Sequence, residues 1–161
     1  AYLKRAYAAA EKSLDELWKT RADGLPYRSP YDALIMASIV ERETAVPDER
    51  AMIAGVFVRR LASGMRLQTD PTVIYGLGSA FDGNLRKVDL LADSPYNTYT
   101  RAGLPPTPIC LPGRAAIHAA LHPANGGALY FVARGDGTHQ FSATLAEHEA
   151  AVRRYQLGHK P

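Results

Sequence analysis

Two glutamates at the end of an apolar segment are the first candidates for chemistry. Residues 33–40 read ALIMASIV, and Glu41 and Glu43 follow almost directly. Position 43 continues the bulky stripe of Met36 and Ile39 by steps of three and four, whereas position 41 continues a line of smaller residues. Desolvation on such a stripe and the negative end of a helix both raise a carboxyl pKa, which suits a general acid at neutral pH.

The same two glutamates have a simpler interpretation. Either could form solvated ion pairs with Arg42, Arg50 or Arg59, as surface carboxylates commonly do. From these residues alone, acid catalysis and ion pairing both stay open.

A second group of polar side chains lies at residues 68–72. Asp70 precedes Pro71, which predicts a helix cap followed by a first-turn proline. Gln68 and Thr69 have no capping duty, so they are candidates to bind a polar ligand such as a sugar. Hydration of an ordinary loop would explain them equally well.

The run Tyr-Asn-Thr-Tyr at residues 96–99 offers chemistry suited to glycans. Aromatic rings such as that of Tyr99 stack on sugar faces, and the amide of Asn97 could bind an acetamido group. Turn formation with buried tyrosines is the alternative for this run.

The five histidines raise the question of metal. His118 and His122 have ligand spacing on an expected helix, but no glutamate directly follows His118, as a metalloprotease motif requires. His139 and His148 are expected to be surface or hydrogen-bonded structural residues. The glycines after residue 75 do not complete a dinucleotide fingerprint. We therefore expect neither a metal nor an organic cofactor.

Composition limits the other classes. The formal net charge of +3 arises from 19 basic and 16 acidic residues without a long block of like charge, so no nucleic-acid partner is expected. The single cysteine cannot form an internal disulfide. No run approaches the length of a membrane span, and the chain opens at Ala1 inside an expected helix. We expect residues 1–161 to be one domain of a longer protein, with any anchor upstream.

Periodicity and turn residues predict the elements that must position these side chains. The prediction is a mainly helical α+β domain with one small β-hairpin. Helices are expected at about 2–20, from 30 to just before Pro47, and at 48–61, 70–75, 112–121 and 144–155. Strands are expected at 129–134 and 138–142, and a loop-rich stretch with short helices and turns over 76–111.

Five segments resemble, in order, the motifs of one enzyme family across residues 17–155. They are ASIVERETAVPDER, GMRLQTDPTVIYGLG, SPYNTYTRAGLPPTPI, LHPA and LYFVARGDGTHQFS. The chain thereby resembles the catalytic domain of the MltG (YceG-like) family of endolytic murein transglycosylases. The resemblance implies a lysozyme-like domain, with a glutamate at a helix end facing a cleft that a β-hairpin partly walls.

The resemblance also assigns roles to residues. The second glutamate of the V-E-x-E-T motif is Glu43, the implied catalytic acid, with Glu41 as the fallback. It is followed by Thr44, as serine follows the acid in soluble lytic transglycosylases. The candidates for holding the substrate are Gln68, Thr69, Asp70, Asn97, Tyr99 and Glu41.

The implied reaction cleaves MurNAc-GlcNAc β-1,4 bonds in peptidoglycan and leaves 1,6-anhydro-MurNAc ends, without metal or cofactor. The implied setting is the periplasmic face of the bacterial inner membrane, with an upstream anchor, a LysM-like module and possibly cell-wall synthases as partners. Two alternatives stay open. One is a muramidase with Asp70 as a second carboxylate, and the other is a non-catalytic wall-binding module.

Overall fold

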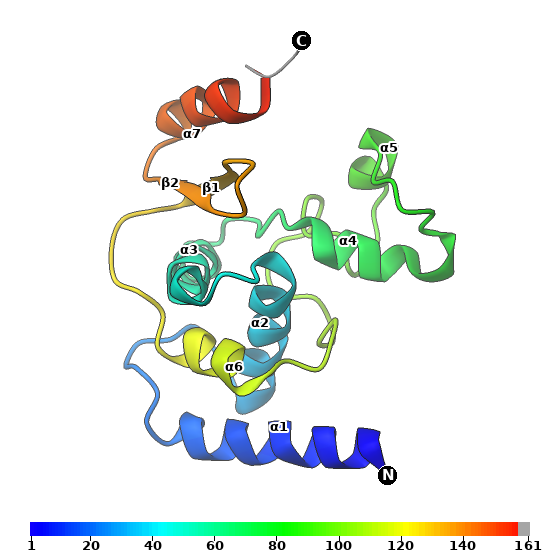
Figure 1. Ribbon diagram of the computed structural model, residues 1–161, viewed down its shortest axis with the longest axis vertical. Coiled ribbons are helices and arrows are strands. Elements are labelled where there is room, and N and C mark those ends of the chain that lie inside the picture. Colours follow the sequence, from blue (N-terminus) through cyan, green and yellow to red (C-terminus); the bar gives the residue numbers. More distant parts are fainter. Residues whose placement is uncertain (158–161) are drawn as a thin grey trace.

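The structure, a computed structural model, describes residues 1–157 and confirms a mainly helical α+β architecture with a single small hairpin (Figure 1). No helix in this part of the chain has the length and apolarity that a membrane crossing requires. The elements are α1 (Tyr2–Trp18), α2 (Pro30–Glu43), α3 (Arg50–Ala62), α4 (Asp70–Leu77), α5 (Lys87–Leu91), α6 (Arg114–Leu121), α7 (Leu145–Val152), β1 (Tyr130–Ala133) and β2 (His139–Ser142).

Helix α2 is the central element. Ser29 stands at its N-cap and Pro30 in its first turn, and it ends at Glu43, where Thr44 turns to an extended conformation. Residues 33–40 are buried except for the half-buried Leu34, which confirms the prediction of a helix covered on every side. It packs against α1, α3, α4 and α6, so its last turn is held firmly in place.

Helix α1 is confirmed as an amphipathic helix, but only part of its apolar stripe is packed. Ala10, Leu14 and Leu17 are buried, whereas Leu3 is 78% exposed and Tyr7 is 60% exposed. The reason is geometric, since the N-terminal half of α1 projects beyond α6 in Figure 1. Periodicity predicts which face is apolar, but not how far a neighbouring element extends along it.

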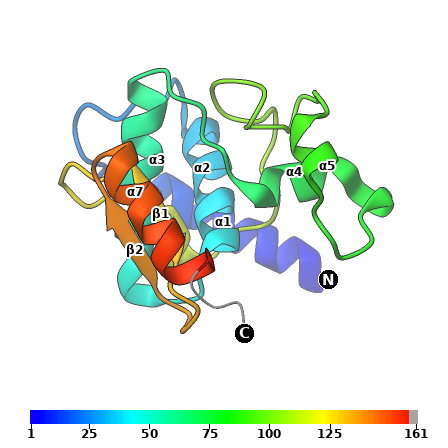
Figure 2. The same cartoon turned by 90° about the horizontal axis from the view of Figure 1, so that it is seen from above.

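The hairpin pairs β1 and β2 antiparallel, with Phe131 opposite Phe141 and Ala133 opposite His139. Phe131 packs edge-on against Phe57 of α3 at a centroid distance of 5.6 Å, which anchors the hairpin on the helical core. The predicted capping box of Thr144 and Glu147 forms at the start of α7. In Figure 2 the hairpin, α7 and α3 lie on one side of α2, while α4 and α5 lie on the other.

Candidate active site

A cleft of about 570 Å³ opens at the end of α2. One side is formed by the loop before α4 and by Tyr99, and the other by the hairpin and α7. Its lining includes Glu43, Arg60, Gln68, Asp70, Leu90, Tyr99, Tyr130, Phe131, His139 and His148. The cleft therefore combines one helix-end carboxyl with aromatic rings and hydrogen-bonding groups, a surface typical of a polar ligand site.

Glu43 is the carboxyl that the helix end presents to this cleft. Its side chain is partly buried, and the hydroxyl of Thr69 donates a hydrogen bond to its Oε1. Burial has the largest effect on the pKa of Glu43 and raises it, and the negative charge of Asp70 raises it further. The Thr69 hydrogen bond and His139 both lower this pKa. The net direction is upward, so Glu43 holds its proton to a higher pH than an ordinary carboxyl, as a general acid must.

A buried cluster of three threonines holds Thr69 against Glu43. The backbone N–H of Thr69 donates to the Thr98 hydroxyl at 3.0 Å, and the Thr72 hydroxyl donates to the Thr69 carbonyl at 2.9 Å. Thr69 is 1% exposed and does not line the cleft. The structure thus places Thr69, a candidate substrate contact by sequence, behind the glutamate as the group that fixes its carboxyl.

Asp70 lies at the rim of the cleft with Tyr99. The Tyr99 hydroxyl donates to Asp70 Oδ1, and the pKa of Tyr99 is raised by burial and by this carboxylate. The prediction that Asp70 caps a helix is wrong. Helix α4 begins at Asp70 itself, with Thr69 at the N-cap and no side-chain capping bond. The Asp70 carboxylate instead holds a ring from a loop distant in sequence.

Gln68 also lines the cleft, with a left-handed backbone at φ 52°. Its Oε1 accepts from Arg60 Nη1 at 3.4 Å, and its backbone N–H donates to the carbonyl of Thr98. Arg60 is 6% exposed and donates also to the Leu129 carbonyl at 2.6 Å, so it joins the hairpin side to the loop side. Sequence reasoning missed Arg60, although it continues the buried line of Ile53 and Phe57 in α3.

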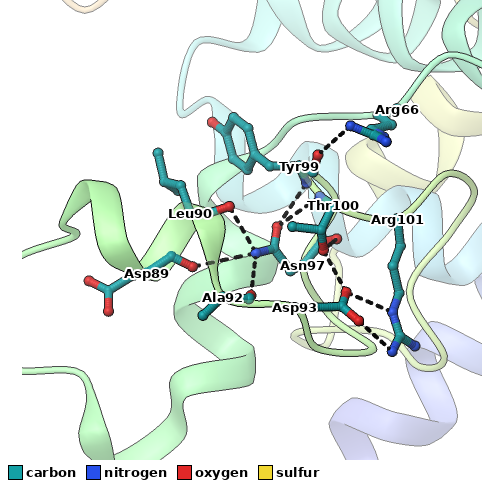
Figure 3. A network of polar contacts seen from close by, with 9 residues as sticks. All are labelled: Arg66, Asp89, Leu90, Ala92, Asp93, Asn97, Tyr99, Thr100 and Arg101. Atoms are coloured by element: carbon teal, nitrogen blue, oxygen red, sulfur yellow. Dashed lines mark hydrogen bonds and ion pairs between the residues drawn. The ribbon is translucent and has the colours of Figure 1, made fainter.

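Asn97 takes part in a turn, which is the alternative that the sequence left open for this run. It is 1% exposed and does not line the cleft. Figure 3 shows its amide donating to main-chain oxygens, including Leu90 at 3.1 Å and Ala92 at 2.7 Å, while Oδ1 accepts from the backbone of Tyr99 at 2.9 Å. The Asn97 side chain thus links the end of α5 to the segment that carries Tyr99. Its amide nitrogen and its oxygen are both engaged, so neither is free to bind an acetamido group.

Glu41 points away from the cleft. Its Oε2 accepts the backbone N–H of Gly113 at 3.0 Å, at the N-terminus of α6. The ion pairs considered for the two glutamates do not form within residues 1–157, where Arg59 donates to the carbonyls of Ala124 and Ala128 instead. The structure therefore brings Glu43, Gln68, Asp70 and Tyr99 together and leaves Glu41 outside.

The histidines divide into two groups. His118 and His122 stack on each other at 4.4 Å away from the cleft, and residues 1–157 contain no cluster of three or more potential metal ligands. His139 and His148 line the cleft, with His139 bound to Glu49 at 2.7 Å and His148 stacked on Tyr130 at 5.1 Å. Sequence reasoning predicted surface or hydrogen-bonded structural histidines. His139 is hydrogen-bonded, whereas the buried Nδ1 of His148 has no hydrogen-bond partner within residues 1–157, and the place of both beside Glu43 was not predicted.

Comparison with known proteins gives concordant matches. A model of the YceG-like family matches residues 1–154. An endolytic murein transglycosylase of Bacillus subtilis (strain 168) is 41% identical over 155 residues, which are 96% of this chain and 41% of that relative. The protein of the same name from Streptococcus pneumoniae serotype 2 (strain D39) is 35% identical over 131 residues, covering 78% of this chain and 23% of the relative.

A solved structure shows the same fold. The crystal structure of a YceG-like protein from Listeria monocytogenes superposes with a TM-score of 0.69 and 48% sequence identity, covering 76% of this chain and 39% of that one. The chain thus spans about two fifths of the Bacillus relative and of this solved protein.

Proposed function

The chain belongs to the YceG-like family, and on that basis we propose that it is the catalytic domain of an endolytic peptidoglycan transglycosylase, with Glu43 as its acid. The single observation that carries the proposal is a partly buried carboxyl, with a raised pKa, facing a polar and aromatic cleft. The names of the curated relatives support peptidoglycan as the substrate.

In the proposed reaction Glu43 acts twice. It first donates its proton to the glycosidic oxygen that leaves C1 of MurNAc, while the 2-acetamido group stabilises the electron-poor C1. The resulting carboxylate then takes the proton of the C6 hydroxyl as that oxygen bonds to C1, closing a 1,6-anhydro ring and restoring the acid. The attack is intramolecular and therefore favoured by proximity, so no second carboxylate is required.

The cleft supplies groups for this chemistry. Thr69 holds one carboxyl oxygen of Glu43, and within residues 1–157 the other makes no hydrogen bond to protein, so it is the oxygen we assign to proton transfer. We propose that Gln68, Asp70 and Tyr99 contact the sugars, since all three line the cleft. Asn97 and Glu41 have no place in this contact set, because their polar atoms are engaged elsewhere.

Analysis of product ends tests the proposal. Purified glycan strands would be digested in water labelled with heavy oxygen, and the fragments identified by mass spectrometry. Internal cuts with unlabelled anhydro-MurNAc ends, one water lighter than hydrolysed ends, are expected. Reducing ends that carry the label would establish a muramidase, for which Asp70 is the available second carboxylate. Strands that bind but stay uncut would indicate a wall-binding module.

A second proposal concerns the location and partners of the full-length protein. We place it on the periplasmic face of the inner membrane, with an anchor and a LysM-like module outside residues 1–161 and cell-wall synthases as candidate partners. Protease accessibility of the full-length protein in spheroplasts compared with intact cells tests this orientation. Protection in spheroplasts would contradict it.

A further inference from the structure

Glu49 and His139 form a close pair at the wall of the cleft. The ring Nδ1 of His139 lies 2.7 Å from Oε2 of Glu49, and the backbone N–H of His139 donates to Oε1 of the same carboxylate at 2.8 Å. Each side chain is only 12% exposed. Glu49 ends the short turn Pro47–Glu49 after α2, and His139 begins β2, so the pair joins the segment that follows Glu43 to the hairpin.

This pairing determines which nitrogen of the ring is free. An ionised carboxylate only accepts hydrogen bonds, so Nδ1 must carry the hydrogen. In the neutral ring Nε2 then has a lone pair, and within residues 1–157 it makes no hydrogen bond to protein. Phe131 packs perpendicular to the ring at a centroid distance of 5.4 Å, which holds its plane.

The location of the ring indicates a ligand for that nitrogen. His139 lines the same cleft as Glu43. A structural pair buried in the hairpin would account for the contact between Nδ1 and Glu49. It leaves Nε2, which makes no hydrogen bond to protein within residues 1–157, available to a ligand in the cleft that His139 lines.

We propose that His139 contacts the glycan directly, with Nε2 accepting a hydrogen bond from a sugar hydroxyl, and that Glu49 is the positioning residue that fixes this tautomer. The identity of the ligand rests on the proposed function. The orientation of the His139 ring does not depend on the proposed function, because it follows from the contacts of the ring with Glu49 and Phe131.

Nitrogen-15 NMR of the histidine rings tests the contact directly. Glu43→Gln protein would be titrated with uncrosslinked glycan strands, so that binding is observed without turnover. The Nε2 resonance of His139 is expected to move with saturation, while Nδ1 keeps its hydrogen. A resonance unmoved at saturating glycan would overturn the proposal, and this readout needs no substitution at His139.

Substitutions give a second measurement. In the same background His139→Phe should weaken glycan binding about tenfold, and His139→Gln, which keeps an acceptor, should weaken it less. In the otherwise wild-type chain Glu49→Gln should raise KM more than it lowers kcat, because the tautomer is no longer fixed. His118→Phe is the matched control, since His118 is exposed on α6 away from the cleft, and should bind glycan normally.

The outcomes separate the two proposals. If Glu43→Gln still cleaves glycan, the assigned acid is wrong, yet the Nε2 titration with bound strands still tests His139. If His139→Phe is folded and binds as tightly as the His118→Phe control, the histidine contact is wrong while the proposed reaction stands.

Discussion

Glu41 and Glu43 end the same helix two residues apart, yet their carboxyls enter different surroundings. Glu43 faces the cleft, partly buried, with Thr69 as its donor and Asp70 close by. Glu41 lies outside the cleft and accepts the backbone N–H of Gly113. Two residues correspond to about 200° around a helix, so the two side chains leave it on nearly opposite faces.

The difference shows that environment, and not residue type, sets what each carboxyl can do. Burial raises the pKa of Glu43, which suits the proposed proton donor. The bond of Glu41 joins the end of α2 to the start of α6, which is a structural task. If this contrast is correct, the same substitution at the two positions must have very different effects.

The largest effect is expected for Glu43→Gln, which keeps the shape of the side chain but cannot deliver the proton. Cleavage of glycan strands should fall by about 10³-fold, the scale of a lost general acid. Circular dichroism and thermal melting should show a folded domain. Near wild-type turnover in this variant would remove Glu43 as the acid, and full loss in Glu41→Gln instead would move the role there.

The next effect is expected at Thr69, which holds the Glu43 carboxyl without lining the cleft. Thr69→Val should lower kcat about 10- to 100-fold, because the carboxyl is no longer oriented. Its hydrogen bond lowers the pKa of Glu43, so its loss raises that pKa and keeps the acid protonated to higher pH. The alkaline limb of the pH–rate profile should therefore move upward in pH.

Thr69→Ser is the matched control, since it retains the hydroxyl and should stay within a few-fold of wild type. A Thr69→Val profile with an unchanged alkaline limb would contradict the proposed link between this hydroxyl and Glu43.

A smaller effect is expected for Asp70→Asn. The negative charge of Asp70 raises the pKa of Glu43, so removing it lowers that pKa and ionises the acid earlier. The alkaline limb should move to lower pH, opposite to Thr69→Val, and the rate at pH 7 should fall about three- to tenfold. The Asn carbonyl can still accept from Tyr99. A loss as large as that of Glu43→Gln would favour the muramidase instead.

The smallest effect on activity is expected for Glu41→Gln, which should cleave within about twofold of wild type. Weakening the bond to Gly113 should cost about 1 kcal/mol of folding free energy. For a domain of this size that lowers Tm by about 2–4 °C, which differential scanning calorimetry can measure. A large catalytic loss without a change in Tm would mean that Glu41 reaches the substrate.

Local patterns in the sequence were sufficient for most of the elements and for separating Glu43 from Glu41. The stripe through Met36 and Ile39 distinguished position 43 from position 41, and the structure places these two carboxyls on different sides of α2. The Thr144–Glu147 capping box and the hairpin were likewise predicted from short-range signals. A helix or strand fixes the directions of side chains a few residues apart, so such patterns can be followed without tertiary contacts.

Only the tertiary structure decided which groups surround Glu43. Thr69 and Asn97 belong to hydrogen-bonding motifs suited to a ligand. In the folded chain, however, Thr69 donates to the Glu43 carboxyl and Asn97 donates to main-chain carbonyls, so both stabilise the structure around the cleft. The partner of Glu49 is His139, ninety positions along the chain. Such contacts depend on how the hairpin and the loops pack on α2 and α3. No residue spacing predicts that packing, because each element can present its polar groups to solvent, to a ligand or to another element.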